Sequence, residues 1–84
     1  MRLVPQRTTG HLDQRLTPAW QMWKADRAAT CEVFSHLFGW ELRLMIGQEL
    51  VQSRVVRTEG ELNATAIEWR EAMRARGWSD IDHG

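Results

Sequence analysis

One cysteine and three histidines are the residues of this chain best suited to metal binding or nucleophilic chemistry: Cys31, His11, His36 and His83. Cys31 and His36 lie five positions apart, so an unbroken strand would place their side chains on opposite faces. No pair among the four has the spacing typical of zinc ligands. We therefore expect a buried structural Cys31, solvated histidines, and neither a metal site nor a cofactor.

The recurring catalytic motifs do not occur in the sequence, which has no glycine-rich phosphate loop, no nucleophile elbow and no HExxH. His36 could act as an acid or base beside Phe38, but no second catalytic group can be placed near it. Glu41 is better used in an ion pair with Arg54 than as a general base. The sequence thus predicts a protein that is not an enzyme.

Length and composition predict one small domain that needs support beyond its own core. A chain of 84 residues buries only about 60–65% of the surface that its unfolded form exposes, so its core is thin. Cys31 is its single cysteine, so no disulfide can form within the chain. The five tryptophans bring large apolar area, part of which we expect at an interface. Oligomerisation is therefore the expected source of additional stability.

The charges balance, with eleven lysines and arginines against eleven aspartates and glutamates. This neutrality removes the usual electrostatic case for a dedicated nucleic-acid binder. No apolar run approaches the roughly 18–20 residues that a membrane span needs. The N-terminus also lacks the continuous apolar segment of a signal peptide. We expect a cytoplasmic protein without membrane contact.

The chain divides into three parts by pattern. Residues 1–17 show neither strand nor helix periodicity and predict an N-terminal arm that is disordered or ordered only by a partner. Residues 18–78 carry the folded domain, and residues 79–84 form a polar tail. The domain is where any function must be sought first.

The domain begins with two stretches typical of strands, Trp20–Lys24 and Thr30–Phe34. We expect a two-residue turn between them at Asp26-Arg27, although the pair lacks the glycine that such turns prefer. That turn predicts Trp20 opposite Val33 and Met22 opposite Cys31, which places four apolar residues on one face.

A second strand pair, Trp40–Ile46 and Glu49–Arg57, gives the clearest pattern in the chain. Gly47-Gln48 lies between the strands, and glycine in the first position predicts a type II′ hairpin turn. This turn fixes the expected cross-strand pairs, which are Ile46 with Glu49, Leu44 with Val51, Leu42 with Ser53, Trp40 with Val55 and Glu41 with Arg54.

One amphipathic helix follows the hairpin. Thr58 and Glu61 form a capping box at its start. Leu62, Ala66, Trp69 and Met73 then recur at spacings of four, three and four, which is a single apolar stripe. Gly77 predicts the stop, with Trp78 folding back on the last turn. The expected fold is α+β, with a three- or four-stranded antiparallel meander and one C-terminal helix packed on one face.

The sheet face away from this helix is the expected functional surface. It combines aromatic residues, methionine and arginine, which is more typical of an interface than of bare surface, although an ordinary amphipathic face would show scattered apolar residues too. We expect a small interaction or regulatory module that acts through this face as a homodimer or with a larger protein partner. The expected partner-binding residues are Trp23, Arg43, Met45, Leu50 and Arg54.

Two alternatives remain open. The arginine and aromatic residues of the same face, together with the basic arm, could bind nucleic acid and stack single-stranded bases, as RNA-recognition sheets do. An exposed terminal strand could instead pair with a partner peptide.

Three segments resemble a set of short bacterial proteins: Gly39-Trp40-Glu41-Leu42-Arg43-Leu44, Ser53-Arg54-Val55, and the helix end from Trp69 to Gly77-Trp78. The resemblance covers roughly residues 18–78. It implies a stand-alone bacterial domain and carries no activity or site residue with it.

Overall fold

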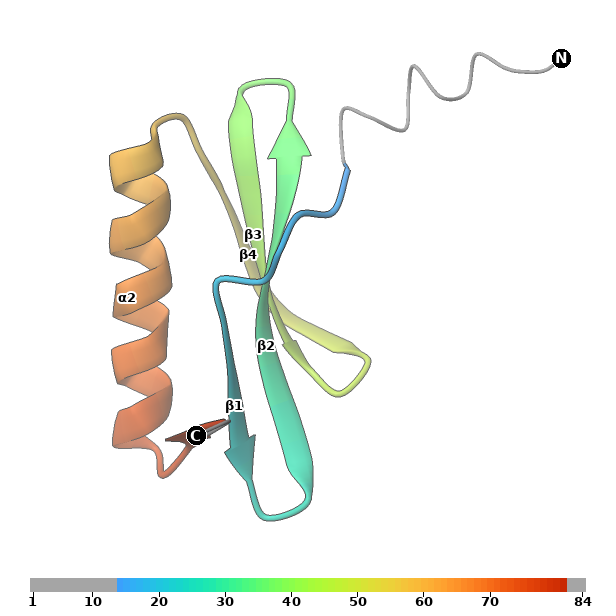
Figure 1. The fold of residues 1–84 in the computed structure, drawn as a ribbon, viewed down its shortest axis with the longest axis vertical. Coiled ribbons are helices and arrows are strands. Elements are labelled where there is room, and N and C mark those ends of the chain that lie inside the picture. Colours follow the sequence, from blue (N-terminus) through green and yellow to red (C-terminus); the bar gives the residue numbers. More distant parts are fainter. Residues whose placement is uncertain (1–13, 82–84) are drawn as a thin grey trace, which may run out of the picture.

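The computed structural model describes residues 14–81 as a five-stranded antiparallel sheet with one helix on one face (Figure 1). The strands lie in the order β4-β3-β2-β1-β5. The elements are β1 (Trp20–Lys24), β2 (Arg27–His36), β3 (Gly39–Ile46), β4 (Glu49–Val56), α2 (Glu59–Ala75) and β5 (Ser79–Asp80). The α+β class and the C-terminal helix are confirmed, while the strand count is five rather than three or four.

The additional strand β5 forms because the chain reverses sharply after α2. Gly77 has a φ of +98°, and the N–H of Trp78 donates to the carbonyl of Met73 at 3.1 Å, the long bond of a Schellman motif. Trp78 is thereby buried beside the helix end. The chain then runs back along β1, with Ser79 opposite Trp23 and Asp80 opposite Met22. Two residues of the expected polar tail thus become an edge strand.

The start of α2 shows the expected Thr58 cap, while the return bond from Glu61 goes to Arg57 rather than to Thr58 as in a regular capping box. The Thr58 side chain accepts a hydrogen bond from the N–H of Glu61 at 3.0 Å, which satisfies one of the unpaired donors of the first turn. The Glu61 carboxylate in return accepts from the N–H of Arg57 at 2.9 Å. The helix therefore begins at Glu59, directly after Thr58, whose backbone is still extended.

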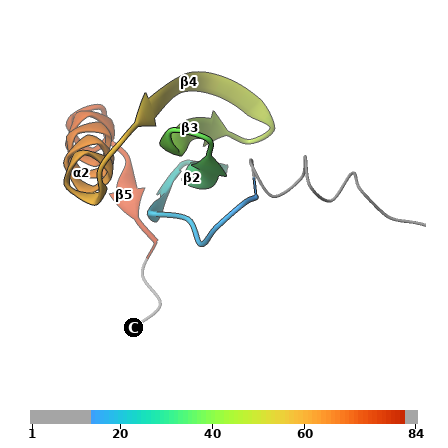
Figure 2. The ribbon, with the colours of Figure 1, turned by 90° about the horizontal axis from the view of Figure 1, so that it is seen from above.

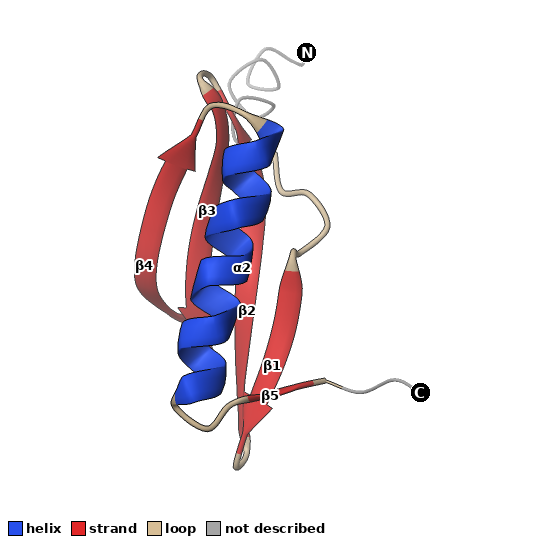
Figure 3. Cartoon of the chain, turned by 90° about the vertical axis from the view of Figure 1, so that its left-hand side faces the viewer, coloured by secondary structure: helices blue, strands red, loops and turns tan. Residues whose placement is uncertain are grey.

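The core lies between α2 and one face of the sheet. Figure 3 shows α2 crossing that face over β3 and β2, with β4 on one side and β1 on the other. Ala66, Trp69 and Met73 are the buried apolar residues of the helix. They belong to one cluster with the buried strand residues Met22, Ala29, Cys31, Leu42, Leu44 and Val56. Seen from above, β4 curves over β3 toward the start of the helix (Figure 2).

The β1–β2 turn lies one residue earlier than expected. Ala25 and Asp26 form it, so Trp20 pairs with Cys31 and Met22 with Ala29. The expected pairs Trp20–Val33 and Met22–Cys31 are therefore wrong. The difference is two residues in register, so Trp20 and Met22 still face α2. Ala25 adopts a φ of +56°, the conformation that glycine would take without strain.

The β3–β4 hairpin departs from the expected register at a β-bulge. Gly47 has the predicted positive φ, +62°, and Ile46 pairs with Glu49 as expected. Met45 then pairs with Leu50 but Leu44 pairs with Gln52, which leaves Val51 as the extra residue. The remaining expected pairs are wrong, and those observed are Leu42 with Arg54, Glu41 with Val55 and Trp40 with Val56.

The described part of the expected arm, residues 14–17, runs along the edge of β2. The N–H of Leu16 donates to the carbonyl of Val33 at 2.7 Å, and the N–H of Ser35 donates to that of Gln14 at 2.8 Å. Arg15 and Phe34 form the bridge between them. The sheet contacts thus begin before Pro18, while residues 1–13 of the arm lie outside the described range.

Candidate functional site

The face of the sheet away from α2, called the open face below, is uncovered among the described residues. The strand registers place its residues in rows, one of which crosses β1, β2, β3 and β4 as Gln21, Thr30, Met45 and Leu50. The next row toward the β1–β2 turn begins with Trp23 and Ala28. Four of the five expected partner-binding residues, Trp23, Arg43, Met45 and Leu50, share this face.

One end of the open face is apolar. Trp23 is 48% exposed and Leu50 is 52% exposed, which is high for large apolar side chains. Met45, half-buried, lies between them and opposite both Thr30 and Leu50. We call Trp23, Ala28, Met45 and Leu50 the apolar patch. Its residues come from four different strands, so the sheet itself fixes their spacing.

The other end of the open face is polar and internally paired. The Arg43 guanidinium lies 4.2 Å from the centre of the Phe34 ring and 3.0 Å from the Glu41 carboxylate. Arg15 approaches the other residues of this end, 3.6 Å from Glu32 and 5.6 Å from the Phe34 ring. Phe34 is only 8% exposed as a result. The ring is therefore covered by cations and is not free to stack on a ligand.

Arg54 does not belong to the open face. The bulge at Val51 reverses the faces of the following residues, so Arg54 pairs with Leu42 and lies on the helix side. Its guanidinium approaches Glu68 and the Thr65 hydroxyl, both at 3.4 Å, and the Trp69 ring at 5.7 Å. Gln52 and Val56 change faces with it. The expected Glu41–Arg54 pair is replaced by Glu41–Arg43 and Arg54–Glu68.

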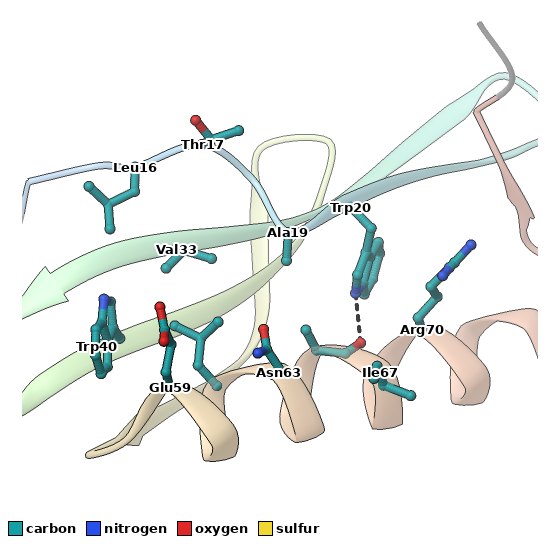
Figure 4. Close-up of a pocket in the computed structure, with 12 residues that line it drawn as sticks. Leu16, Thr17, Ala19, Trp20, Val33, Trp40, Glu59, Asn63, Ile67 and Arg70 are labelled. Carbon is teal, nitrogen blue, oxygen red and sulfur yellow. Dashed lines mark hydrogen bonds between the residues drawn. The ribbon is translucent and has the colours of Figure 1, made fainter. Parts of the chain in front are cut away.

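A groove of about 670 Å³ lies on the helix side, between the first half of α2 and the sheet edge formed by residues 16–20. Trp40 and Trp20 stand at its two ends (Figure 4). The Trp20 indole N–H donates to the carbonyl of Ala66 at 2.8 Å, which fixes that ring against the helix. Between the two rings, the aliphatic residues Leu16, Val33, Leu62 and Ala66 contribute to the lining. The volume is in the usual range of small-molecule pockets.

The sequence patterns did not reveal this groove, because they only place Trp20 and Trp40 on the apolar faces of their strands. Both rings are half-buried in the structure and pack against the cluster from its margin. The helix axis passes beside them rather than over them, and the repeat of apolar residues carries no information about that offset.

Two charged residues line the groove, and their situations differ. Arg70 donates two hydrogen bonds to the Asp80 carboxylate, at 2.9 and 2.8 Å, and Arg74 contacts the same carboxylate. The hydrogen bond from Arg70, followed by that from Arg74, lowers the pKa of Asp80 to about 2 despite some desolvation. Glu59, at the other end, has no hydrogen bond or ion pair within residues 14–81. The available charge of the groove is therefore negative.

Of the residues first considered for metal or nucleophilic chemistry, the structure describes Cys31 and His36, which lie five positions apart on β2. Cys31 is fully buried, and this burial raises the pKa of its thiol to about 12. The Nδ1 atom of His36 accepts a hydrogen bond from the N–H of Phe38 at 3.1 Å within the β2–β3 turn. His11 and His83 lie outside the described residues. Within the described range, no group of three or more His, Cys, Asp or Glu is placed to hold a metal ion.

Comparison with known proteins found no family model, no curated protein and no solved structure that matches this chain. The resemblance to short bacterial proteins therefore stays a prediction. In the part of the chain that the structure describes, no helix is long and apolar enough to cross a membrane. Function must be inferred from the chain's own residues.

Proposed function

We propose that this protein is a non-enzymatic interaction module that forms a homodimer through the open face. The observation that carries this proposal is the position of Trp23, Met45 and Leu50 on a sheet face that no described element covers. Exposed aromatic and aliphatic side chains at fixed spacing are typical anchors of protein interfaces. The polar end, with its Arg43–Glu41 and Arg15–Glu32 pairs, supplies the hydrated rim that such interfaces have.

A second copy of the chain is a suitable partner because the surface can pair with itself. A twofold axis near Met45 sets the apolar patch of one copy against that of the other. The charged pairs of the two copies then lie at the rim of this contact, where they remain in contact with water. Standard interfaces bury about 800 Å² on each partner, so the contact has to extend from the patch toward the Arg43 row.

The nucleic-acid alternative has less support. Of the two open-face aromatic residues in the described range, Phe34 is covered by Arg43 and Arg15, and Trp23 alone is exposed. Arg43 and Arg15 are themselves paired with carboxylates. Their charges are therefore largely neutralised toward a phosphate backbone, and the chain as a whole is neutral.

The test is the molar mass in solution, measured by sedimentation equilibrium for the wild type and two charge variants. Met45→Glu and Leu50→Glu place a carboxylate inside the apolar patch, and we expect each to weaken dimerisation at least tenfold. Leu37→Glu is the matched control, because Leu37 is 67% exposed in the β2–β3 turn, at the far end of β2 and β3 from the patch.

A wild type that stays monomeric up to high concentration excludes the homodimer. If a different protein binds the wild type but not the patch variants, the proposal that the open face is an interface still holds. If the Met45→Glu and Arg43→Glu variants still bind every partner of the wild type, the open face is excluded as an interface with other proteins too.

A further inference from the structure

We propose that the groove between α2 and the sheet edge binds a small organic cation, in which an ammonium group is carried on an aromatic or alkyl body. This site lies on the opposite side of the sheet from the open face and does not depend on dimerisation.

The first ground is the shape and lining of the groove. Its volume of about 670 Å³ exceeds what one side chain could fill, and its walls are formed by two indole rings and aliphatic side chains. The Trp20 ring is held by its hydrogen bond to Ala66 and so needs no ordering when a ligand enters. An apolar body packed between the two tryptophans would bury the side that faces the groove.

The second ground is the charge. Arg70 is neutralised by its bidentate contact with Asp80, so it offers little attraction to an anion. Glu59 is unpaired among the described residues and rises from the helix toward Val33, next to Trp40 (Figure 4). An ammonium group at this end would lie next to both the Glu59 carboxylate and the Trp40 indole ring, and carboxylates and aromatic rings are the groups that proteins use to hold such cations.

The helix dipole does not reverse this preference. The N-terminus of α2 carries a partial positive charge of roughly half a unit, which by itself would disfavour a cation. Glu59 and Glu61 both lie in the first turn, and their two carboxylates outweigh it. The field at this end of the groove therefore favours a positive ligand over a neutral or negative one.

The experiment is a titration of the ¹⁵N-labelled protein with benzyltrimethylammonium, followed through the indole N–H resonances. We expect the Trp20 and Trp40 signals to shift with a dissociation constant on the order of 1 mM, as befits a ligand of this size. Trp23, on the open face, is the internal control and should not shift. Benzyl alcohol and phenylacetate test the charge preference with a similar ring, and both should bind more weakly.

Two variants separate the site from a general surface effect. Glu59→Gln should weaken binding about fivefold, as expected for loss of one exposed charge contact. Ile67→Lys, at a 58% exposed position of the rim, should weaken it through repulsion without disturbing the core. Glu71→Gln, on the same helix but outside the groove, should leave the affinity unchanged.

The proposal is overturned if Trp20 and Trp40 do not shift, if phenylacetate binds as well as the cation, or if Glu59→Gln binds as well as the wild type. Loss of dimerisation in Met45→Glu with retained binding of the cation would show that the two proposals stand separately.

Discussion

At the scale of single residues, Asp80 gives the clearest electrostatic feature of the fold. It ties the short strand β5 to α2 through Arg70 and Arg74. Because these arginines lower its pKa to about 2, below the value of about 3.9 in an unfolded chain, the folded state binds fewer protons here than the unfolded state. The stabilisation by Asp80 is therefore complete above about pH 4 and is lost as the pH falls toward 2.

An NMR titration of the Asp80 side-chain carboxyl should show a midpoint near 2, and the resonance should be absent in Asp80→Asn. We expect Asp80→Asn to unfold in acid with a smaller loss of stability between pH 4 and 2 than the wild type shows. Glu49→Gln, at the exposed hairpin end, is the control that retains the Asp80 contribution. A midpoint close to 4 would mean that the arginine contacts do not persist in solution.

At the scale of elements, the bulge at Val51 decides which face each residue of β4 presents. Removing Val51 would join Leu50 to Gln52, whose partners Met45 and Leu44 are already adjacent. The ladder would become regular while Arg54 and Val56 kept their faces. We therefore expect the Val51 deletion to fold, with a free energy of unfolding within about 1 kcal/mol of the wild type.

Deletion of both Val51 and Ser53 is the matched control, because the second deletion has no bulge left to absorb it and would turn either the hairpin end or Val56 to the wrong face. We expect that variant to lose several kcal/mol, on the order of the cost of removing a buried aliphatic side chain. Urea unfolding of the two deletion variants compares them directly. Equal stability of both would show that the register of β4 is not fixed by its contacts with the core.

The same strand shows which features of the fold the sequence patterns could predict and which they could not. The turn at Gly47, the cap at Thr58 and the stop at Gly77 were predictable, because each depends on local backbone chemistry. The bulge was not, because β4 contains apolar neighbours, Leu50-Val51 and Val55-Val56, that satisfy either register. The expected Glu41–Arg54 pair supported the regular register in the same way. Arg54 can pair with a carboxylate on either face of the sheet, with Glu41 in the regular register and with Glu68 in the observed one.

At the scale of the whole molecule, one helix is too narrow to cover a five-stranded sheet. The apolar stripe of α2 predicts that the helix packs on the sheet, but not how far it lies from each edge. Because α2 lies over β3 and β2, the groove between Trp20 and Trp40 remains beside it, while no element of residues 14–81 packs on the open face. Both candidate sites thus arise from the arrangement of elements. The shared face of four of the five expected partner-binding residues was predictable, because alternation along strands is a local property.

The homodimer predicts a stability that depends on protein concentration, because association stabilises the folded state alone. For a chain of this length, 1 kcal/mol corresponds to roughly 4–8 °C in the unfolding midpoint. A tenfold rise in concentration above the dissociation constant should therefore raise the midpoint by about 3 °C or more per step in calorimetry. Met45→Glu should remove this dependence, and Leu37→Glu should retain it, since only the former places a charge in the apolar patch. A wild-type unfolding midpoint that is independent of protein concentration would mean that the open face does not hold two copies together. The exposed side chains of Trp23 and Leu50 would then be expected to bind a different protein.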